Sequence, residues 1–230
     1  MSKRQEIRQK RLRQQKKQRF IYTGIITAFA LLVAALLIAP NFRPVGTIVE
    51  ITPIARPQAV GNAMGDPNAP VKVEEYADFQ CPACMRFAKN IEPQIIQQYV
   101  ATGKVYYVFK TFSFLGQESV DAAQAAYCAM DQGKFWEYHD ILFANQNGEN
   151  IGDFTIPRLK AFADTLGLDS STFNACLDGE THKRKVNDDR ASGSNLGVNA
   201  TPSFVVNEKL VYSDKLISTI EEELAKNPAQ

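Results

Sequence analysis

The sequence contains few cysteines and no repeats, and these absences exclude several classes of protein. Four cysteines in 230 residues are too few for a fold that is held together mainly by disulfides. No internal repeat or long low-complexity segment is present, so a solenoid is excluded. Hydrophobic residues make up 45% of the chain, which is enough for a packed core and excludes a wholly disordered protein.

Basic residues are scarce outside the N-terminal segment. Of the 26 Lys and Arg residues, nine fall within residues 1–40, together with one of the 25 Asp and Glu residues. Residues 41–230 therefore carry a net charge of −7. An excess of acidic residues repels a phosphate backbone, so this part of the chain is not expected to bind nucleic acid.

Residues 21–39 lack charged side chains altogether. A helix of these 19 residues would be about 28 Å long, close to the thickness of the hydrocarbon core of a bilayer. Because the basic block precedes this run, the sequence predicts a cytoplasmic segment at 1–19, a transmembrane signal anchor at 20–40 and an extracytoplasmic remainder. A buried core helix, a cleaved signal peptide and a basic arm that binds nucleic acid are the alternatives. No cysteine directly follows the run, so a lipoprotein is excluded.

The rest of the chain divides into a proline-containing segment and a domain. Residues 41–62 are expected to form an extended extracytoplasmic stalk. In residues 63–230 the hydrophobic periodicity predicts a strand, a helix kinked at Pro93, a second strand, a long helical insert, two short strands and a final helix. The predicted strands are 71–76, 105–109, 203–206 and 210–212, and the predicted helices are 82–101, 118–130, 134–144, 156–166, 170–177, 180–195 and 215–226.

Cys81 and Cys84 form a C-x-x-C motif at the junction of a predicted strand and a predicted helix. The N-terminus of a helix has unpaired N–H groups and a partial positive charge, which stabilise the reactive thiolate. Cys81 would be the exposed nucleophile, and Cys84, one turn deeper, would be the resolving thiol that closes the disulfide. A zinc half-site and a plain structural disulfide are the alternatives, although the remaining cysteines and histidines show no paired ligand spacing.

Three separated segments give the chain a family resemblance: VKVEEYADFQCPAC at residues 71–84, DQGKFWEYHD at residues 131–140 and GVNATPSFVV at residues 197–206. In this order they resemble the DsbA-like thiol–disulfide oxidoreductases of the thioredoxin superfamily, of the membrane-anchored bacterial type. The resemblance covers about residues 64–226. It implies an α/β thioredoxin fold with a helical domain inserted at about residues 115–196. Ala83 departs from the histidine that tunes the thiolate in the enterobacterial relative.

The resemblance also implies supporting residues around the cysteine pair. Thr201 and Pro202 match the cis-proline loop that faces the C-x-x-C motif, where the backbone of Thr201 could pair with a substrate chain. A proline that merely starts a strand is the alternative. Glu75 matches a buried acid that assists proton movement at the deeper cysteine, whereas an exposed strand carboxylate is the alternative. Glu74 must face the opposite side of the strand, because side chains alternate.

The other two cysteines, Cys128 and Cys176, fall in two helices of the predicted insert. By resemblance to actinobacterial relatives they are expected to form a structural disulfide, which suits an oxidising compartment. Two buried free thiols that act as small hydrophobic residues are the alternative.

The resemblance implies an enzyme, a protein thiol–disulfide oxidoreductase. The first expectation is a dithiol oxidase that introduces disulfides into reduced exported proteins through Cys81 and Cys84. A quinone-linked membrane reoxidase of the DsbB or vitamin K epoxide reductase type would reoxidise it. No cofactor or metal is expected for the exchange itself, and a monomer is the default. The alternatives are a reductase or isomerase, for example in cytochrome c maturation, and a non-catalytic thioredoxin-fold binding module.

Overall fold

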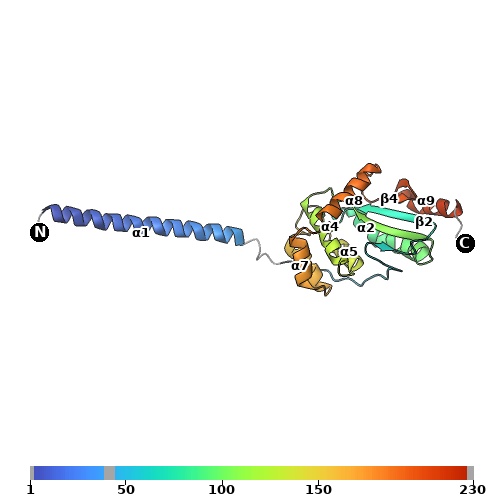
Figure 1. The fold of residues 1–230 in the computed structure, drawn as a ribbon, viewed down its shortest axis with the longest axis horizontal. Helices are drawn as coiled ribbons and strands as arrows, with labels where there is room; N and C mark the ends of the chain where they lie inside the picture. The colour runs from blue at the N-terminus through green and yellow to red at the C-terminus, as the bar shows by residue number, and fades with distance from the viewer. Residues whose placement is uncertain (1–2, 39–44, 227–230) are drawn as a thin grey trace. The chain divides into compact units, whose positions relative to one another are not determined.

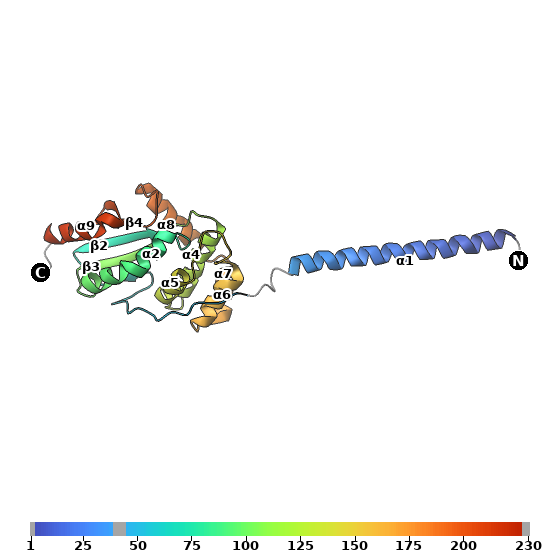
Figure 2. The same ribbon diagram turned by 180° about the vertical axis from the view of Figure 1, so that it is seen from behind.

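The computed structural model describes residues 3–38 and 45–226, with the side chains of its first helix described from residue 16 to residue 34. The chain divides into two compact units, Met1–Pro44 and Val45–Gln230, which are treated separately. Figures 1 and 2 show the ribbon of both units from opposite sides.

The first unit contains one helix, α1 (Lys3–Ile38). This helix includes most of the predicted apolar run, whereas residues 39 and 40 of the predicted anchor lie outside the described residues. A search of the described part of the chain finds no helix with the length and apolar character needed to cross a membrane. The transmembrane anchor therefore stays a prediction from the sequence.

The second unit is built on a mixed five-stranded sheet in the order β1-β3-β2-β4-β5. The strands β2 (Val71–Ala77) and β3 (Val105–Thr111) run parallel, and the other pairs of neighbours run antiparallel. A parallel pair needs a crossover, which here consists of α2 (Pro82–Asn90), α3 (Glu92–Ile95) and the π-helical turn η2 (Ile96–Val100). The remaining strands are β1 (Ala63–Met64), β4 (Ser203–Val206) and β5 (Lys209–Tyr212).

The crossover helix is interrupted next to Pro93, as the sequence predicts. The helix α2 ends at Asn90 with Ile91 as its C-cap, and α3 begins with Glu92. Pro93 has no N–H group, so it cannot donate a helical hydrogen bond to the preceding turn. The bend separates α2, which begins at the cysteine pair, from α3, in which Glu92 is buried.

Five helices form the insert after β3, and one helix follows the sheet. Within the second unit, Figure 1 shows the insert helices α4, α5 and α7 gathered at one end of the sheet and α9 at the other. Their order and extent agree with the predicted insert, so the thioredoxin-like α/β fold with a helical insertion is confirmed. They are α4 (Gln117–Met130), α5 (Phe135–Ala144), α6 (Ile156–Thr165), α7 (Ser170–Asp178) and α8 (Lys183–Asn195), followed by α9 (Ser213–Lys226) after the sheet.

Residues 45–62, here called the strap, fall in the predicted stalk but lie against the helices of the second unit. Asn145, the C-cap of α5, receives a hydrogen bond from the Val49 N–H at 2.8 Å and donates one to the Val49 carbonyl at 2.9 Å. Arg158 of α6 donates to the Val45 carbonyl at 2.7 Å. Two isoleucines of the strap also pack against the main core. Since its backbone and side chains have partners on two helices, the strap belongs to the domain; residues 41–44 lie outside the described residues.

Alternation along β2 sends its side chains to two different environments. Glu75 is 1% exposed and lies in register with Phe109 of β3 and Phe204 of β4, on the face that contributes to the main core. Glu74 points to the other face and forms an ion pair with Lys72 at 2.8 Å. The strand therefore buries one of its two neighbouring acids and leaves the other at a polar surface, as alternation predicts.

Candidate active site

The turn before the cysteines is held by Asp78, a fully buried residue at the end of β2. The Asp78 carboxylate accepts hydrogen bonds from the Ser119 hydroxyl at 2.7 Å, and from the backbone N–H groups of Gln80 at 2.9 Å and Phe114 at 3.0 Å. The Asp78 carbonyl accepts the Cys81 N–H at 3.0 Å. The Asp78 carboxylate therefore links the turn before Cys81 to the residues at the start of the helical insert.

Cys81 is the N-cap residue of α2, with extended backbone angles, and Pro82 occupies the first turn of the helix. Proline suits this position because its missing N–H would have no partner there. The Cys81 side chain is 8% exposed, whereas Cys84 is fully buried one turn below, and both thiols are free. The pair therefore has one member that a substrate thiol can approach and one that it cannot.

The loop opposite Cys81 contains a cis peptide bond between Thr201 and Pro202. The Cys81 thiol donates to the Thr201 carbonyl oxygen at 3.4 Å. The Thr201 hydroxyl is buried and lies close enough to the Cys81 sulfur to stabilise a thiolate there, and it has no other partner among the described residues. Residues far apart in the sequence thus meet at the cysteine, in the position that the resemblance implied for this loop.

The two cysteines have opposite proton affinities. The Cys84 thiol, the Thr201 side chain and the backbone N–H groups of Ala83 and Cys84 lower the pKa of Cys81 to about 6, against the opposing effect of burial. Burial raises the pKa of Cys84 well above the usual value of 9.0, and the neighbouring Cys81 and Glu75 raise it further. At neutral pH the pair therefore holds a thiolate on Cys81 and a proton on Cys84, the arrangement that suits nucleophilic attack by Cys81.

Glu75 lies beneath the pair in the apolar core. Burial raises the pKa of Glu75 to about 8, and the charge of Glu92 adds to this effect. The Tyr107 hydroxyl donates a hydrogen bond of 2.6 Å to the Glu75 carboxylate, which favours the ionised form. A carboxyl group with a pKa near neutrality can accept a proton and return it within one reaction cycle.

Three comparisons with known proteins bear on this geometry. A family model described as Thioredoxin matches residues 58–225. The chain is 31% identical over 171 residues to the probable disulfide bond formation protein D of Bacillus cereus, covering 71% of this chain and 79% of that protein. It is 32% identical over 168 residues to disulfide bond formation protein D of Bacillus subtilis, covering 70% and 76% of the two chains. The crystal structure of oxidised BdbD from Bacillus subtilis superposes with a TM-score of 0.67 at 28% identity, covering 77% of this chain and 100% of that one.

The chain belongs to the DsbA-like thiol–disulfide oxidoreductases of the thioredoxin family. The residues matched by the family model include β2, the cysteine pair, the cis-proline loop and nearly all of α9. As a DsbA-like protein it is a protein thiol–disulfide oxidoreductase, in agreement with the sequence prediction.

The other cysteines of this DsbA-like chain are joined to each other. Cys128 in α4 and Cys176 in α7 form a disulfide with an S–S distance of 2.04 Å, the pairing that the resemblance implied. His182 lies near both sulfur atoms, and the possible ligand atoms of these three residues all lie within 4.8 Å of one another, close enough to surround a metal ion. Because both sulfurs are used in the disulfide, they offer no thiolate to a metal.

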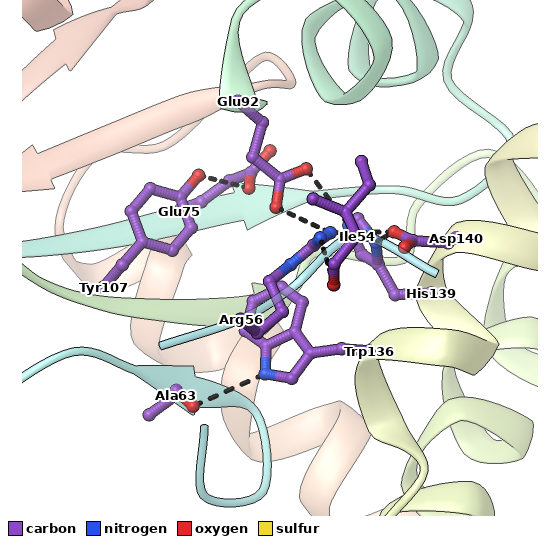
Figure 3. A network of polar contacts seen from close by, with 9 residues as sticks. All are labelled: Ile54, Arg56, Ala63, Glu75, Glu92, Tyr107, Trp136, His139 and Asp140. Carbon is purple, nitrogen blue, oxygen red and sulfur yellow. Dashed lines mark hydrogen bonds and ion pairs between the residues drawn. The ribbon is translucent and has the colours of Figure 1, made fainter. Parts of the chain in front are cut away.

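Sequence reasoning missed a set of charged residues beside Glu75. Figure 3 shows Arg56 of the strap between Glu92 of α3 and Asp140 of α5, with His139 next to them. The Arg56 guanidinium lies 3.2 Å from the Glu92 carboxylate and 2.8 Å from that of Asp140. A signal for Glu92 was present, because it follows Ala88 by four residues and precedes Ile95 by three on the apolar face of the crossover helix. Arg56 gave no such signal.

Proposed function

We propose that this DsbA-like enzyme is a dithiol oxidase that donates the disulfide formed by Cys81 and Cys84 to reduced exported proteins. The observation that best supports the proposal is the division of roles within the pair, with a lowered pKa for Cys81 and a raised pKa for Cys84. A stabilised Cys81 thiolate is a good leaving group, so the reduced state is favoured and the disulfide is readily given away. The names of the Bacillus relatives, disulfide bond formation protein D, support the same direction of exchange.

The reaction runs through two exchanges in which electrons and protons balance. A substrate thiolate attacks the Cys81 sulfur, the disulfide bond breaks, and the departing Cys84 sulfur takes a proton. A second substrate thiolate then attacks the substrate sulfur of the mixed disulfide, and Cys81 leaves as a thiolate. The substrate loses two electrons and the cysteine pair gains them. A membrane reoxidase linked to quinone, of the DsbB or vitamin K epoxide reductase type, would accept these electrons in turn.

We further propose that the domain acts outside the cytoplasm and is held by a membrane anchor at residues 20–40. The uncharged run at 21–39 and the basic block before it support this location. In spheroplasts, an impermeant maleimide should label Cys81 in the full chain after mild reduction. Labelling only after lysis would contradict the proposed location.

The direction of exchange is tested by equilibrating the protein with glutathione buffers and counting trapped thiols on Cys81 and Cys84 by mass spectrometry. A reduction potential between about −120 and −180 mV is expected for a donor of disulfides. A value near about −270 mV would instead indicate a reductase. A pair that never exchanges under native conditions would leave only a binding role for the fold.

A further inference from the structure

The buried charges beside the cysteine pair are unbalanced. Three carboxylates, those of Glu75, Glu92 and Asp140, are here called the acid cluster. Glu75 and Glu92 are each 1% exposed, and the Asp140 side chain is 14% exposed. Arg56 is the permanent cation that the structure places in contact with Glu92 and Asp140, and its own side chain is 4% exposed. Three ionised carboxylates around one buried cation would repel each other strongly, so at least one of them must hold a proton near neutral pH.

The geometry selects Glu75 as the holder of that proton. The Arg56 guanidinium contacts Glu92 at 3.2 Å and Asp140 at 2.8 Å, and it lies 5.0 Å from the centre of the Trp136 ring. Among the described residues, Glu75 forms no ion pair with the guanidinium and accepts a hydrogen bond only from the neutral Tyr107 hydroxyl. Figure 3 shows this arrangement, with the Tyr107 hydroxyl joined to Glu75 and the Glu92 carboxylate joined to Arg56. The cation therefore neutralises two acids directly and leaves the third to take the proton.

The acid cluster also has an exit to solvent. Asp140 and Arg56 line a pocket of about 610 Å³ between the strap and α5. His139, which is 1% exposed, lies with Nδ1 2.9 Å from the Asp140 carboxylate and Nε2 3.9 Å from that of Glu92. Ionisable groups thus lead from Glu92, next to Glu75, to an open surface without crossing the apolar core.

We propose that Arg56 is a positioning residue for the redox reaction: by neutralising Glu92 and Asp140 from the strap, it leaves Glu75 to exchange the proton of Cys84. This inference rests on the proposed redox role of the pair and deepens it. The ionisable groups around Glu75 are Tyr107 from β3, Cys84 from α2, Glu92 from α3, His139 and Asp140 from α5, and Arg56 from the strap. Of these groups, Glu92 is a buried acid and Arg56 is a buried cation. Removing one or the other should therefore shift the proton affinity of Glu75 in opposite directions.

The test follows the step in which Cys84 must lose its proton. The reduced protein is treated with oxidised glutathione at low pH, so that Cys81 forms a mixed disulfide with glutathione while Cys84 stays protonated. After a jump to higher pH, the Cys84 thiolate attacks the Cys81 sulfur, glutathione leaves as a thiolate, and the Cys84 proton passes to Glu75. Acid quenching and mass spectrometry give the rate of this closing step against pH.

Arg56→Gln should move the midpoint of the closing step to higher pH by about one unit and slow it about tenfold at pH 7. Glu92→Gln should move the midpoint to lower pH, because it removes a negative charge and frees the guanidinium to act on Glu75. The double variant should return close to the wild-type profile, since both charges are lost together. If Arg56→Gln does not fold, the shift of the closing-step midpoint to lower pH in Glu92→Gln still tests the inference.

Arg158→Gln is the matched control, because Arg158 also holds the strap but contacts none of the three acids. Its closing profile should equal that of the wild type. Equal shifts in Arg56→Gln and Arg158→Gln, or an upward or absent shift in Glu92→Gln, would overturn the inference while leaving the proposed function intact. A protein whose Cys81 never forms the mixed disulfide would instead contradict the proposed function itself.

Discussion

The molecule contains two pairs of cysteines, of which one pair is free and the other forms a disulfide. Cys81 and Cys84 are free and three positions apart, and Cys81 lies at the start of a helix. Cys128 and Cys176 are joined across 48 positions and connect the bodies of two helices. The first pair faces backbone N–H groups and a cis-proline loop, and the second joins two helices of the insert, with Cys128 buried and Cys176 half-buried. The surroundings, and not the cysteines, therefore decide which pair exchanges.

Two buried acids accept a hydrogen bond from a tyrosine. Tyr107 donates to Glu75 near the reactive pair, and Tyr127, which directly precedes Cys128 of the structural pair, donates to Asp189. The difference lies in the countercharge. Lys185 contacts Asp189 directly, whereas no cation is in hydrogen-bond contact with Glu75 in the described part of the chain. An acid with a direct cation stabilises the fold, while an acid without one is free to hold and release a proton.

The largest expected effect separates the pairs by activity. Cys81→Ser should abolish disulfide exchange with a reduced model peptide, because no other thiol occupies the helix N-terminus. The double variant Cys128→Ser/Cys176→Ser should retain an exchange rate within about twofold of the wild type, since the insert supplies no reacting atom. Exchange rates are measured by fluorescence of the peptide. A loss of exchange in the double variant would contradict the division of roles.

The next effect separates the pairs by stability. Removing the Cys128–Cys176 disulfide should lower the free energy of unfolding by about 4 kcal/mol, because the bridge restricts a loop of 48 positions in the unfolded chain. Reducing only Cys81 and Cys84 should change stability far less, since they close a short loop. Urea titration of each species measures both values. Equal losses for the two pairs would show that loop length is not the cause.

The third effect concerns the acids and their pH dependence. Glu75 has a pKa raised to about 8, so its neutral form stabilises the folded protein fully below pH 4.5, and this contribution is lost as the pH rises through 8. Glu75→Gln should remove this loss, so the variant gains stability relative to the wild type between pH 5 and pH 8.5. It should also slow the closing step by removing the proton acceptor. Asp189→Asn is the control, and its closing step should be unchanged.

The smallest effect concerns the loop above Cys81. Alkylation of Cys81 should be half-maximal near pH 6, and the reduced protein should lose stability as the pH falls through that value, because the thiolate is the favoured folded form. Thr201→Val removes a hydroxyl that lowers this pKa, so the midpoint should rise by less than about one unit. The pH profile of iodoacetamide labelling measures the shift. A fall in the midpoint would contradict the assigned role of the hydroxyl.

Local patterns predicted the order of the elements and the reactive cysteine pair, whereas the disulfide between Cys128 and Cys176 was implied only by the family resemblance. The apolar alternation of 71–77, the helical spacing after Cys81 and the proline at 93 each act over a few residues, so the sequence shows them directly. Alternation also predicted that Glu75 and Glu74 face opposite sides. The acid cluster could not be predicted in the same way. Its cation, Arg56, comes from a segment whose prolines indicate only extended backbone, and its position depends on contacts with helices about 90 to 110 residues later.

The docked strap has a consequence for how this domain could be recombined with other anchors. A chimera that joined a foreign membrane segment directly to residue 63 would keep all four cysteines, the cis-proline loop and Glu75. It would nevertheless lose the guanidinium beside Glu92 and the backbone that pairs with Asn145. A junction before Val45 would keep both. The unit that can be exchanged intact between relatives therefore starts at the strap, about 18 residues before the first strand of the sheet.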